Sequence, residues 1–121
     1  MHYLLTEEQK MIVDICRQIV DERIKPVRAE LDEKAEFPWE IIKEIGKSDL
    51  FRLFIAEEYE GMGTGIFEVC LATEELSRGD LSVATSYAAS GLGLIPINVG
   101  GNDEQKKRFL PQLASGEKLA A

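Results

Sequence analysis

The chain has 121 residues, enough for one domain with a single hydrophobic core but few for an enzyme that must enclose a bulky cofactor. Its 14 basic and 22 acidic residues give a formal net charge of −8, which argues against a nucleic-acid backbone or an anionic membrane surface as its partner. The basic residues are interspersed with acidic ones, so no basic patch offsets this charge.

Residues 1–32 predict an amphipathic helix followed by a second, shorter one. They contain neither the basic segment nor the small-residue cleavage site of a secretion signal, so we expect a cytoplasmic protein. Thr6–Gln9 has the pattern of a capping box, which begins a helix with an apolar stripe from Ile12 to Ile24. Pro26 interrupts this pattern and is expected to start the second helix, which runs to about Asp32.

Residues 37–55 predict one helix and a buried connection. Pro38 opens the helix and places Trp39 on its buried side, and we expect the helix to end near Gly46 to Asp49. The segment Leu50–Ile55 alternates poorly and contains two aromatic residues, so it predicts a buried connector or a short extended piece.

A glycine-rich turn at Glu60–Gly65 leads into the next predicted helix. Thr64 is expected to cap this helix, and Gly79 is expected to end it in a left-handed conformation. The residues predicted to face inward are Phe67, Cys70, Leu71 and Leu76.

The segment Leu81–Asn102 carries no charged residue, and apolar residues surround nearly all of its first half. Such a helix is normally buried by other helices, so we expect a central core helix, capped by Asp80, that breaks near Gly91–Gly93. Its serines, its glycines and Pro96 would be costly in hydrocarbon, which argues against a membrane span. Asn102 or Asp103 then caps a last amphipathic helix, whose inward residues are Phe109, Leu110 and Leu113.

The chain offers few groups for metal or nucleophilic chemistry. His2 is its only histidine, which excludes a Ser-His-Asp triad and a histidine-rich zinc site within the chain. Cys16 and Cys70 form no CxxC pair, so we expect both to be small buried residues in a reducing compartment. Adjacent acids such as Glu74 and Glu75 point in different directions from a helix and are expected to be solvated.

Segments along the whole chain resemble the acyl-CoA dehydrogenases. The resemblance is carried by LTEEQK at Leu5–Lys10, IKPVRAELD at Ile24–Asp32, IAEEYEGMG at Ile55–Gly63, EELSRGD at Glu74–Asp80 and the final GNDEQKKRFLPQLASGEKLAA. Their order and spacing match that family without a gap. Ala56 and Glu60 depart from the proline and glycine usual there, which affects loop geometry more than fold.

The resemblance implies an all-α N-terminal domain over residues 1–121, an orthogonal bundle of about six helices around a central apolar helix. It implies an enzyme that uses FAD to oxidise a saturated acyl-CoA to a trans-2-enoyl-CoA. In the family, a β-domain and a C-terminal helical domain with the glutamate base would follow Ala121. We therefore expect no catalytic residue in this chain, which would wall the acyl-chain pocket, support flavin binding and be inactive alone.

The resemblance also implies an acyl-chain site on the central helix. Matched by position, Ala84, Thr85 and Ala88 would face the acyl chain, and Tyr87 and Leu92 would shape the pocket. Ala84, Ala88 and Leu92 are spaced four apart and are expected to share a face. The alternative is that these small residues only allow close helix packing.

The resemblance also implies a binding site for a partner protein. The family passes electrons to electron-transferring flavoprotein, which would dock in an apolar dimple lined by Ile12, Ile19, Leu50 and Met62. The alternative is that this stripe is ordinary core. The full-length protein is expected to be a homotetramer. Two other functions stay open: an acyl-CoA oxidase, nitroalkane oxidase or flavin monooxygenase of the same fold, and a stand-alone helical interaction domain.

Overall fold

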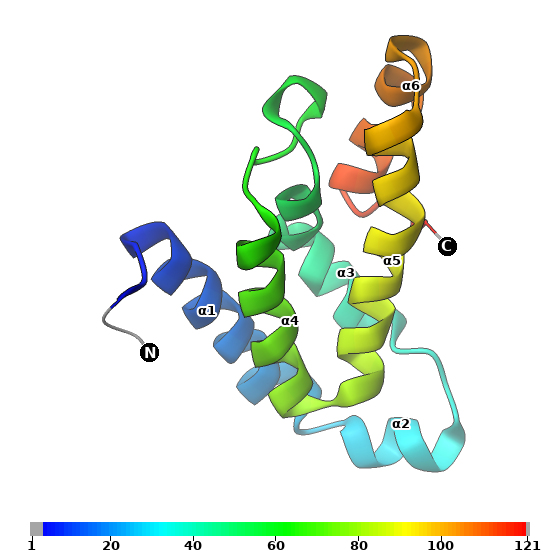
Figure 1. Ribbon diagram of the computed structural model, residues 1–121. Coiled ribbons are helices and arrows are strands. Elements are labelled where there is room, and N and C mark those ends of the chain that lie inside the picture. The colour runs from blue at the N-terminus through cyan, green and yellow to red at the C-terminus, as the bar shows by residue number, and fades with distance from the viewer. Residues whose placement is uncertain (1–3, 121) are drawn as a thin grey trace.

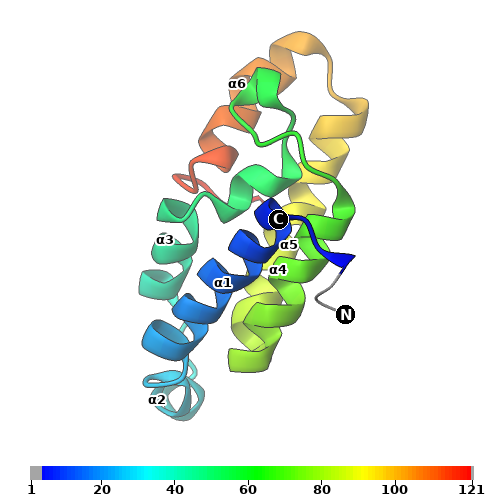
Figure 2. The ribbon, with the colours of Figure 1, turned by 90° about the vertical axis from the view of Figure 1, so that its left-hand side faces the viewer.

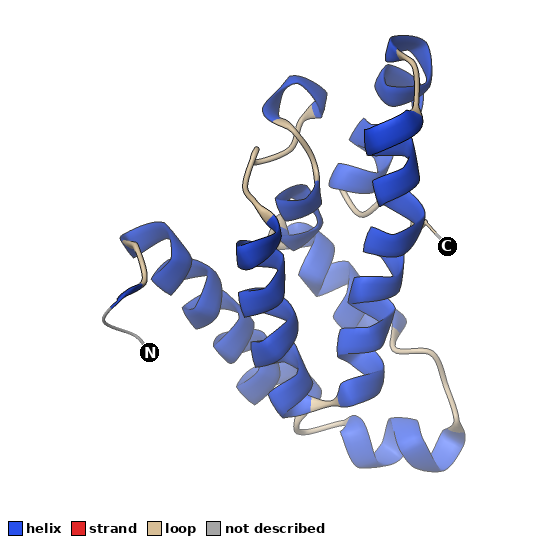
Figure 3. Cartoon of the chain, in the orientation of Figure 1, coloured by secondary structure: helices blue, strands red, loops and turns tan. Residues whose placement is uncertain are grey.

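The computed structural model describes residues 4–120, and within them it contains only helices and connecting loops (Figure 3). The α-helices in this part of the chain are α1 (Glu7–Ile19), α2 (Arg28–Lys34), α3 (Trp39–Lys47), α4 (Ile66–Gly79), α5 (Leu81–Gly100) and α6 (Asp103–Ala114). A π-helical turn, η2 (Val20–Ile24), continues α1, and two 3₁₀ helices, η3 (Leu50–Phe54) and η4 (Glu57–Tyr59), connect α3 to α4. The all-α fold predicted from the sequence is confirmed.

The longest helices, α4 and α5, lie side by side and antiparallel, joined by a one-residue link at Asp80 (Figure 1). α1 packs against α4, and α3 packs against both α1 and α5. α6 packs against α5 at the end of the molecule opposite to α2 (Figure 2). The main hydrophobic core therefore forms where α1, η2, α3, α4, α5 and η3 meet, and a second, smaller cluster lies between α5, α6 and η4.

Three helix starts follow from local side-chain chemistry, as the sequence predicts. The Thr6 hydroxyl accepts a hydrogen bond from Gln9 N at 3.2 Å, and Gln9 Oε1 accepts one from Thr6 N at 3.0 Å. Asn102 and Gln105 form the same reciprocal pair at the start of α6, with both distances 2.9 Å. The Asp80 carboxylate accepts from two N–H groups in the first turn of α5, at 2.8 and 3.1 Å. Each side chain satisfies backbone donors that a helix leaves unpaired.

Tyr87 lies at the centre of the core and is fully buried. Its ring packs against Phe51 and Phe54 of η3, with centroid distances of 5.5 and 5.2 Å and interplanar angles of 41° and 52°. Its hydroxyl donates a hydrogen bond to the Leu50 carbonyl oxygen at 3.0 Å, and burial raises the pKa of this phenol. The connector predicted at residues 50–55 is thus buried as expected, but it is 3₁₀-helical and not extended.

The predicted break in the central helix is wrong, because α5 continues unbroken through Gly91 and Pro96. Gly91 instead makes room for a side chain from another element: a Cβ built on it would lie 2.2 Å from Phe54 Cε1. The glycine therefore allows α5 and η3 to approach closely. No helix in residues 4–120 combines the length and hydropathy needed to cross a membrane.

The predicted left-handed stop at Gly79 is also wrong. Gly79 is the last residue of α4, and its φ is not positive. The next residue, Asp80, is extended with φ −161°. A Cβ on Gly79 would lie 2.9 Å from Val20 Cγ1 and 3.1 Å from Ile24 Cγ2. This glycine lets α4 pack closely on the π-helical turn η2.

Several predicted inward positions are exposed. α4 buries Val69, Ala72, Leu76 and Gly79 against its neighbours, so Phe67 and Cys70 lie on its exposed side and their predicted burial is wrong. Trp39 and Phe109 are likewise exposed, because α3 buries Ile41, Ile42 and Ile45, and α6 buries Leu110, Leu113 and Ala114. Each helix has the predicted periodicity of apolar residues, but the packing of neighbouring helices determines which of those residues are buried.

Two helix starts differ from the predicted ones. The first helix continues through η2 to Ile24, so Pro26 lies in a turn and α2 begins at Arg28. The cap of α4 is Gly65, because the Thr64 hydroxyl donates instead to the Leu53 carbonyl oxygen at 2.9 Å.

We predict that Tyr87→Phe lowers the free energy of unfolding by about 1–3 kcal/mol, because it leaves the Leu50 carbonyl buried without its donor. Thr85→Ala is the matched control: the exposed Thr85 hydroxyl donates only to Leu81 O of its own helix, so its loss should cost less than about 0.5 kcal/mol. Urea denaturation followed by circular dichroism measures both, and equal midpoints for the two variants would contradict the prediction.

Candidate functional site

The face of α5 opposite to Tyr87 is an uncharged, largely apolar surface. Leu92 is 73% exposed and Val99 is 80% exposed. Six residues from Leu81 to Val99 lie on this face, and successive members are four, three, four, three and four positions apart in the sequence. This spacing keeps them in line along a helix. We call them the α5 stripe: Leu81, Thr85, Ala88, Leu92, Ile95 and Val99.

The structure divides the predicted acyl-chain residues between two environments. Thr85 and Leu92 are exposed members of the α5 stripe, and Ala88 is half-buried beside them. Ala84 and Tyr87 are buried in the core. Their role toward an acyl chain stays a prediction, but only Thr85, Ala88 and Leu92 present surface in this structure.

Helix geometry explains why residues spaced four apart do not share one environment. Each residue turns the helix by about 100°, so a step of four drifts by about 40° around the axis. Ala84, Ala88 and Leu92 accordingly pass from buried through half-buried to exposed. Leu81, Ile95 and Val99 were not assigned to the site from the sequence, although their alternating spacing is visible there.

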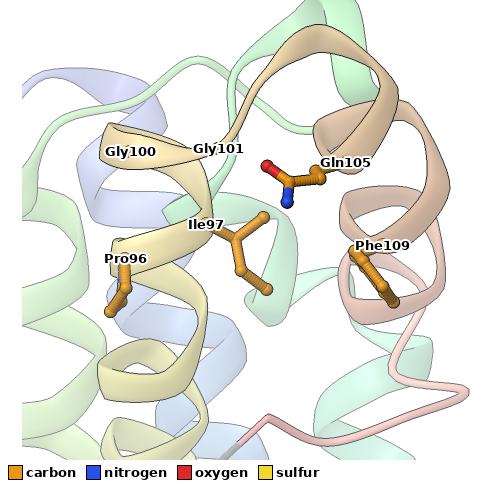
Figure 4. A pocket seen from close by; sticks show the side chains of 6 residues that line it. All are labelled: Pro96, Ile97, Gly100, Gly101, Gln105 and Phe109. Carbon is orange, nitrogen blue, oxygen red and sulfur yellow. The ribbon is translucent and has the colours of Figure 1, made fainter.

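A hollow of about 380 Å³ lies where α5 ends and α6 begins (Figure 4). Its lining residues carry no charge, and its one polar side chain, Gln105, already accepts a hydrogen bond from Asn102 N at 2.9 Å. The side chains of Ile97 and Phe109 border the hollow from the two helices. It offers apolar packing surface and no group for catalysis.

A second hollow, of about 430 Å³, lies between α1 on one side and η4 with the loop that follows it on the other. We call it the α1 hollow; it is lined by Glu8, Met11, Ile12, Ile15, Glu57, Gly61, Met62 and Thr64. Met11 is 62% exposed, and Met62 and Ile15 are also exposed. The thioether side chains are flexible and apolar, which suits them to contact with another protein.

The α1 hollow contains two of the four residues predicted for partner binding. Ile12 and Met62, fifty positions apart in the sequence, both line it. Ile19 and Leu50 lie in the hydrophobic core. Their part in partner binding stays a prediction. Met11 and Ile15 also line the hollow, although neither was predicted for partner binding.

A charged cluster joins α1, η2 and α4. Arg17 donates from Nε and Nη2 to the two carboxylate oxygens of Glu75, both at 3.3 Å, and Arg78 Nε donates to Glu75 at 2.5 Å. Arg78 also lies 3.6 Å from Asp21 of η2. Burial opposes ionisation of Glu75, but the hydrogen bonds from Arg17 and Arg78 outweigh it and hold the pKa of Glu75 below its usual value. Every charge in the cluster is paired, so its role is to hold helices together.

The described residues offer no catalytic constellation. No three or more His, Cys, Asp or Glu residues between positions 4 and 120 are arranged to hold a metal ion. Burial raises the pKa of the Cys16 thiol to about 12, which keeps it from acting as a nucleophile. His2, on which the sequence argument against a triad rested, lies outside the described residues. The α5 stripe and the hollow at its end offer apolar surface that can bind an apolar ligand and exclude water.

Comparison with known proteins gives a consistent result. The family model described as acyl-CoA dehydrogenase, N-terminal domain, matches residues 6–117. The short-chain-specific acyl-CoA dehydrogenase of Clostridium acetobutylicum is 36% identical over 123 aligned residues, which cover 100% of this chain and 32% of that protein. The chain therefore spans about a third of the length of the curated relatives that it matches.

Solved structures agree in fold. A chain in a structure of the electron transferring flavoprotein of Acidaminococcus fermentans has a TM-score of 0.91 and 30% identity, over 98% of this chain and 32% of that one. An acyl-CoA dehydrogenase of Bacillus anthracis in complex with FAD has a TM-score of 0.87 and 35% identity, over 98% of this chain and 21% of that one.

The contribution of the charged cluster to stability can be tested by its dependence on pH. Because the folded pKa of Glu75 is lowered, its contribution to stability is present above the unfolded pKa, about 4.3, and is lost as pH falls through the folded value. We predict that Glu75→Gln lowers the free energy of unfolding by about 1 kcal/mol at pH 7 and by less at pH 3. Glu40→Gln, which removes the exposed partner of Lys43, is the control and should have a smaller effect at pH 7. A pH-independent loss in Glu75→Gln would contradict the prediction.

Proposed function

This chain belongs to the acyl-CoA dehydrogenase N-terminal domain family, and from this we propose that it is the N-terminal domain of an FAD-dependent enzyme. The enzyme oxidises a saturated acyl-CoA to a trans-2-enoyl-CoA. In this proposal the α5 stripe forms one wall of the acyl-chain pocket and supports the flavin site from the side. The dehydrogenase relatives and the FAD complex of the Bacillus anthracis enzyme support the activity and the cofactor.

The observation that carries the proposal is the continuous uncharged face of α5. Each methylene that an acyl chain buries against such a surface contributes about 0.8 kcal/mol. The hydroxyl of Thr85 donates to Leu81 O within the helix, so the stripe presents little unpaired polarity to a ligand. A wall of this kind holds an alkyl chain and keeps water from the reacting carbons.

Proton and hydride transfer need groups that the stripe does not carry. None of its six residues is titratable. In this proposal FAD would be held mainly outside residues 4–120. FAD would supply the hydride acceptor, and this chain would orient the substrate and exclude water.

A domain exchange tests the proposal. This chain replaces the matching N-terminal third of the Clostridium acetobutylicum enzyme, and dye-linked oxidation of acyl-CoAs of increasing length is measured. We predict that Leu92→Trp in this hybrid lowers kcat/KM for the longer acyl chains by about tenfold relative to the shortest, the value of two lost methylenes. Ile66→Trp, at an exposed position of α4, is the control and should leave the length profile unchanged. An equal loss for all lengths, or none, would contradict the acyl-wall assignment.

The partner in the same proposal is electron-transferring flavoprotein, docked at the α1 hollow. The likeness to a chain in the Acidaminococcus fermentans flavoprotein structure supports this choice. The exposed apolar side chains of Met11, Ile15 and Met62 would receive an apolar side chain of that partner. Glu8 and Glu57 at the same hollow would favour a basic residue next to it. Assembly of the longer polypeptide into a homotetramer stays a prediction from the resemblance.

We predict that Met11→Asp in the hybrid raises the KM for electron-transferring flavoprotein by at least about tenfold, because it places a charge in the apolar contact. Dye-linked activity should stay unchanged, since the dye does not use this surface. Ile66→Asp adds the same charge on α4 and serves as the control. A parallel loss of dye-linked activity would point to misfolding, and an unchanged KM with intact activity would exclude the α1 hollow as the docking site.

A further inference from the structure

A third hollow, separate from the α5 stripe and the α1 hollow, lies where α2, the connection after it and the start of α3 meet. Its volume is about 280 Å³, with Leu31 and Ile41 among its apolar lining residues. Phe37 is 43% exposed and Trp39 is 58% exposed, and their ring centroids lie 4.6 Å apart at an interplanar angle of 58°. Two large aromatic side chains thus stay open to solvent beside a preformed concave surface. We call this hollow the aromatic hollow; it is lined by Val27, Glu30, Leu31, Glu36, Phe37, Pro38, Trp39, Glu40 and Ile41.

Three carboxylates and no basic residue line the aromatic hollow: Glu30, Glu36 and Glu40. Glu30 pairs with Lys34 at 2.5 Å and Glu40 pairs with Lys43 at 2.7 Å, each along its own helix. Glu36 belongs to none of the ion pairs in the described part of the chain. The hollow therefore combines exposed ring faces with the negative charge of Glu36, because lysines offset the charges of Glu30 and Glu40. Lys34 also lies within electrostatic reach of Glu36.

We propose that the aromatic hollow seats an arginine side chain of a partner protein. A cation is attracted to the face of an aromatic ring, most strongly that of tryptophan, and arginine makes this contact more often than lysine because its planar guanidinium stacks on the ring. The same guanidinium can donate to Glu36 and Glu40 from its edge. The proposal concerns a surface that neither the acyl chain nor the flavoprotein uses, so it does not rest on the proposed function.

Size and charge favour this occupant over others. Pockets that enclose drug-sized ligands have volumes of about 300–1,000 Å³, so a hollow of about 280 Å³ suits a single side chain. The chain has a formal charge of −8, which repels a second copy of itself and steers a basic partner toward it. Tryptophan and arginine are also the residues that most often dominate protein interfaces.

Trp39 is the only tryptophan of the chain, so its fluorescence reports on the aromatic hollow directly. The probe is the acetylated and amidated peptide Gly-Leu-Arg-Leu-Gly, and its control is the same peptide with citrulline, the neutral isostere of arginine. We expect the arginine peptide to change Trp39 emission saturably and to bind about 2- to 30-fold more tightly than the citrulline peptide, the range of a cation over an aromatic face. Added salt should weaken only the arginine peptide.

Glu36→Gln tests the carboxylate while keeping the tryptophan. It should remove most of the preference for arginine over citrulline. Glu33→Gln changes the net charge equally on α2 without touching the hollow, and it should leave that preference intact. Circular dichroism confirms that both variants are folded.

Each other outcome overturns the proposal. Equal binding of the two peptides would assign the hollow to an apolar side chain. Equal effects of Glu36→Gln and Glu33→Gln would show that the net charge of the chain, and not the hollow, attracts the arginine peptide. A change of Trp39 emission with protein concentration alone, accompanied by dimers in sedimentation, would assign the surface to a second copy of the chain.

Discussion

The contact between Tyr87 and the η3 segment determines how α5 sits in the molecule. The phenol donates to the Leu50 carbonyl oxygen at 3.0 Å, and its ring packs between those of Phe51 and Phe54. Asn98, three turns further along α5, donates to the Phe54 carbonyl oxygen at 3.3 Å. These contacts all lie on one side of the helix. They fix its rotation, and so they decide which residues remain on the exposed side.

A helix face can be covered by an apolar ligand at little cost only if its polar groups are satisfied within the helix, and the hydroxyls of α5 meet this requirement. The hydroxyls of Thr85 and Ser86 donate to Leu81 O and Ser82 O at 2.8 and 2.9 Å, one turn back in the same helix. Such back-bonding hides polar groups from a ligand. The opposite face carries the anchoring contacts of Tyr87, so one element both stabilises the fold and presents the surface proposed to face the acyl chain.

Signals that act over three or four residues were predictable from the sequence, and those that depend on distant neighbours were not. The caps at Thr6 and Asp80 were identified correctly, and Asn102 was one of two candidates for the third, because donor and acceptor lie within one turn. The exposure of Phe67 was missed because α4 has apolar residues on two faces, and only the positions of α1 and α5 decide between them. For the same reason the sequence could name Leu92 for the site but could not separate it from the buried Ala84.

The three candidate surfaces are lined by separate sets of residues, which has consequences for how they work together. The α5 stripe, the α1 hollow and the aromatic hollow share no residue. They lie on α5, on α1 with η4 and the loop after it, and on α2 with α3. Occupation of one surface therefore does not use up the contact residues of another. Coupling between them would have to pass through the core that α1, α3 and α5 share, whose centre is the fully buried Tyr87. Because such cores are close-packed, a shift of α5 against η3 would move α3 and α1 as well, so the Tyr87 contact connects the elements that carry the three surfaces.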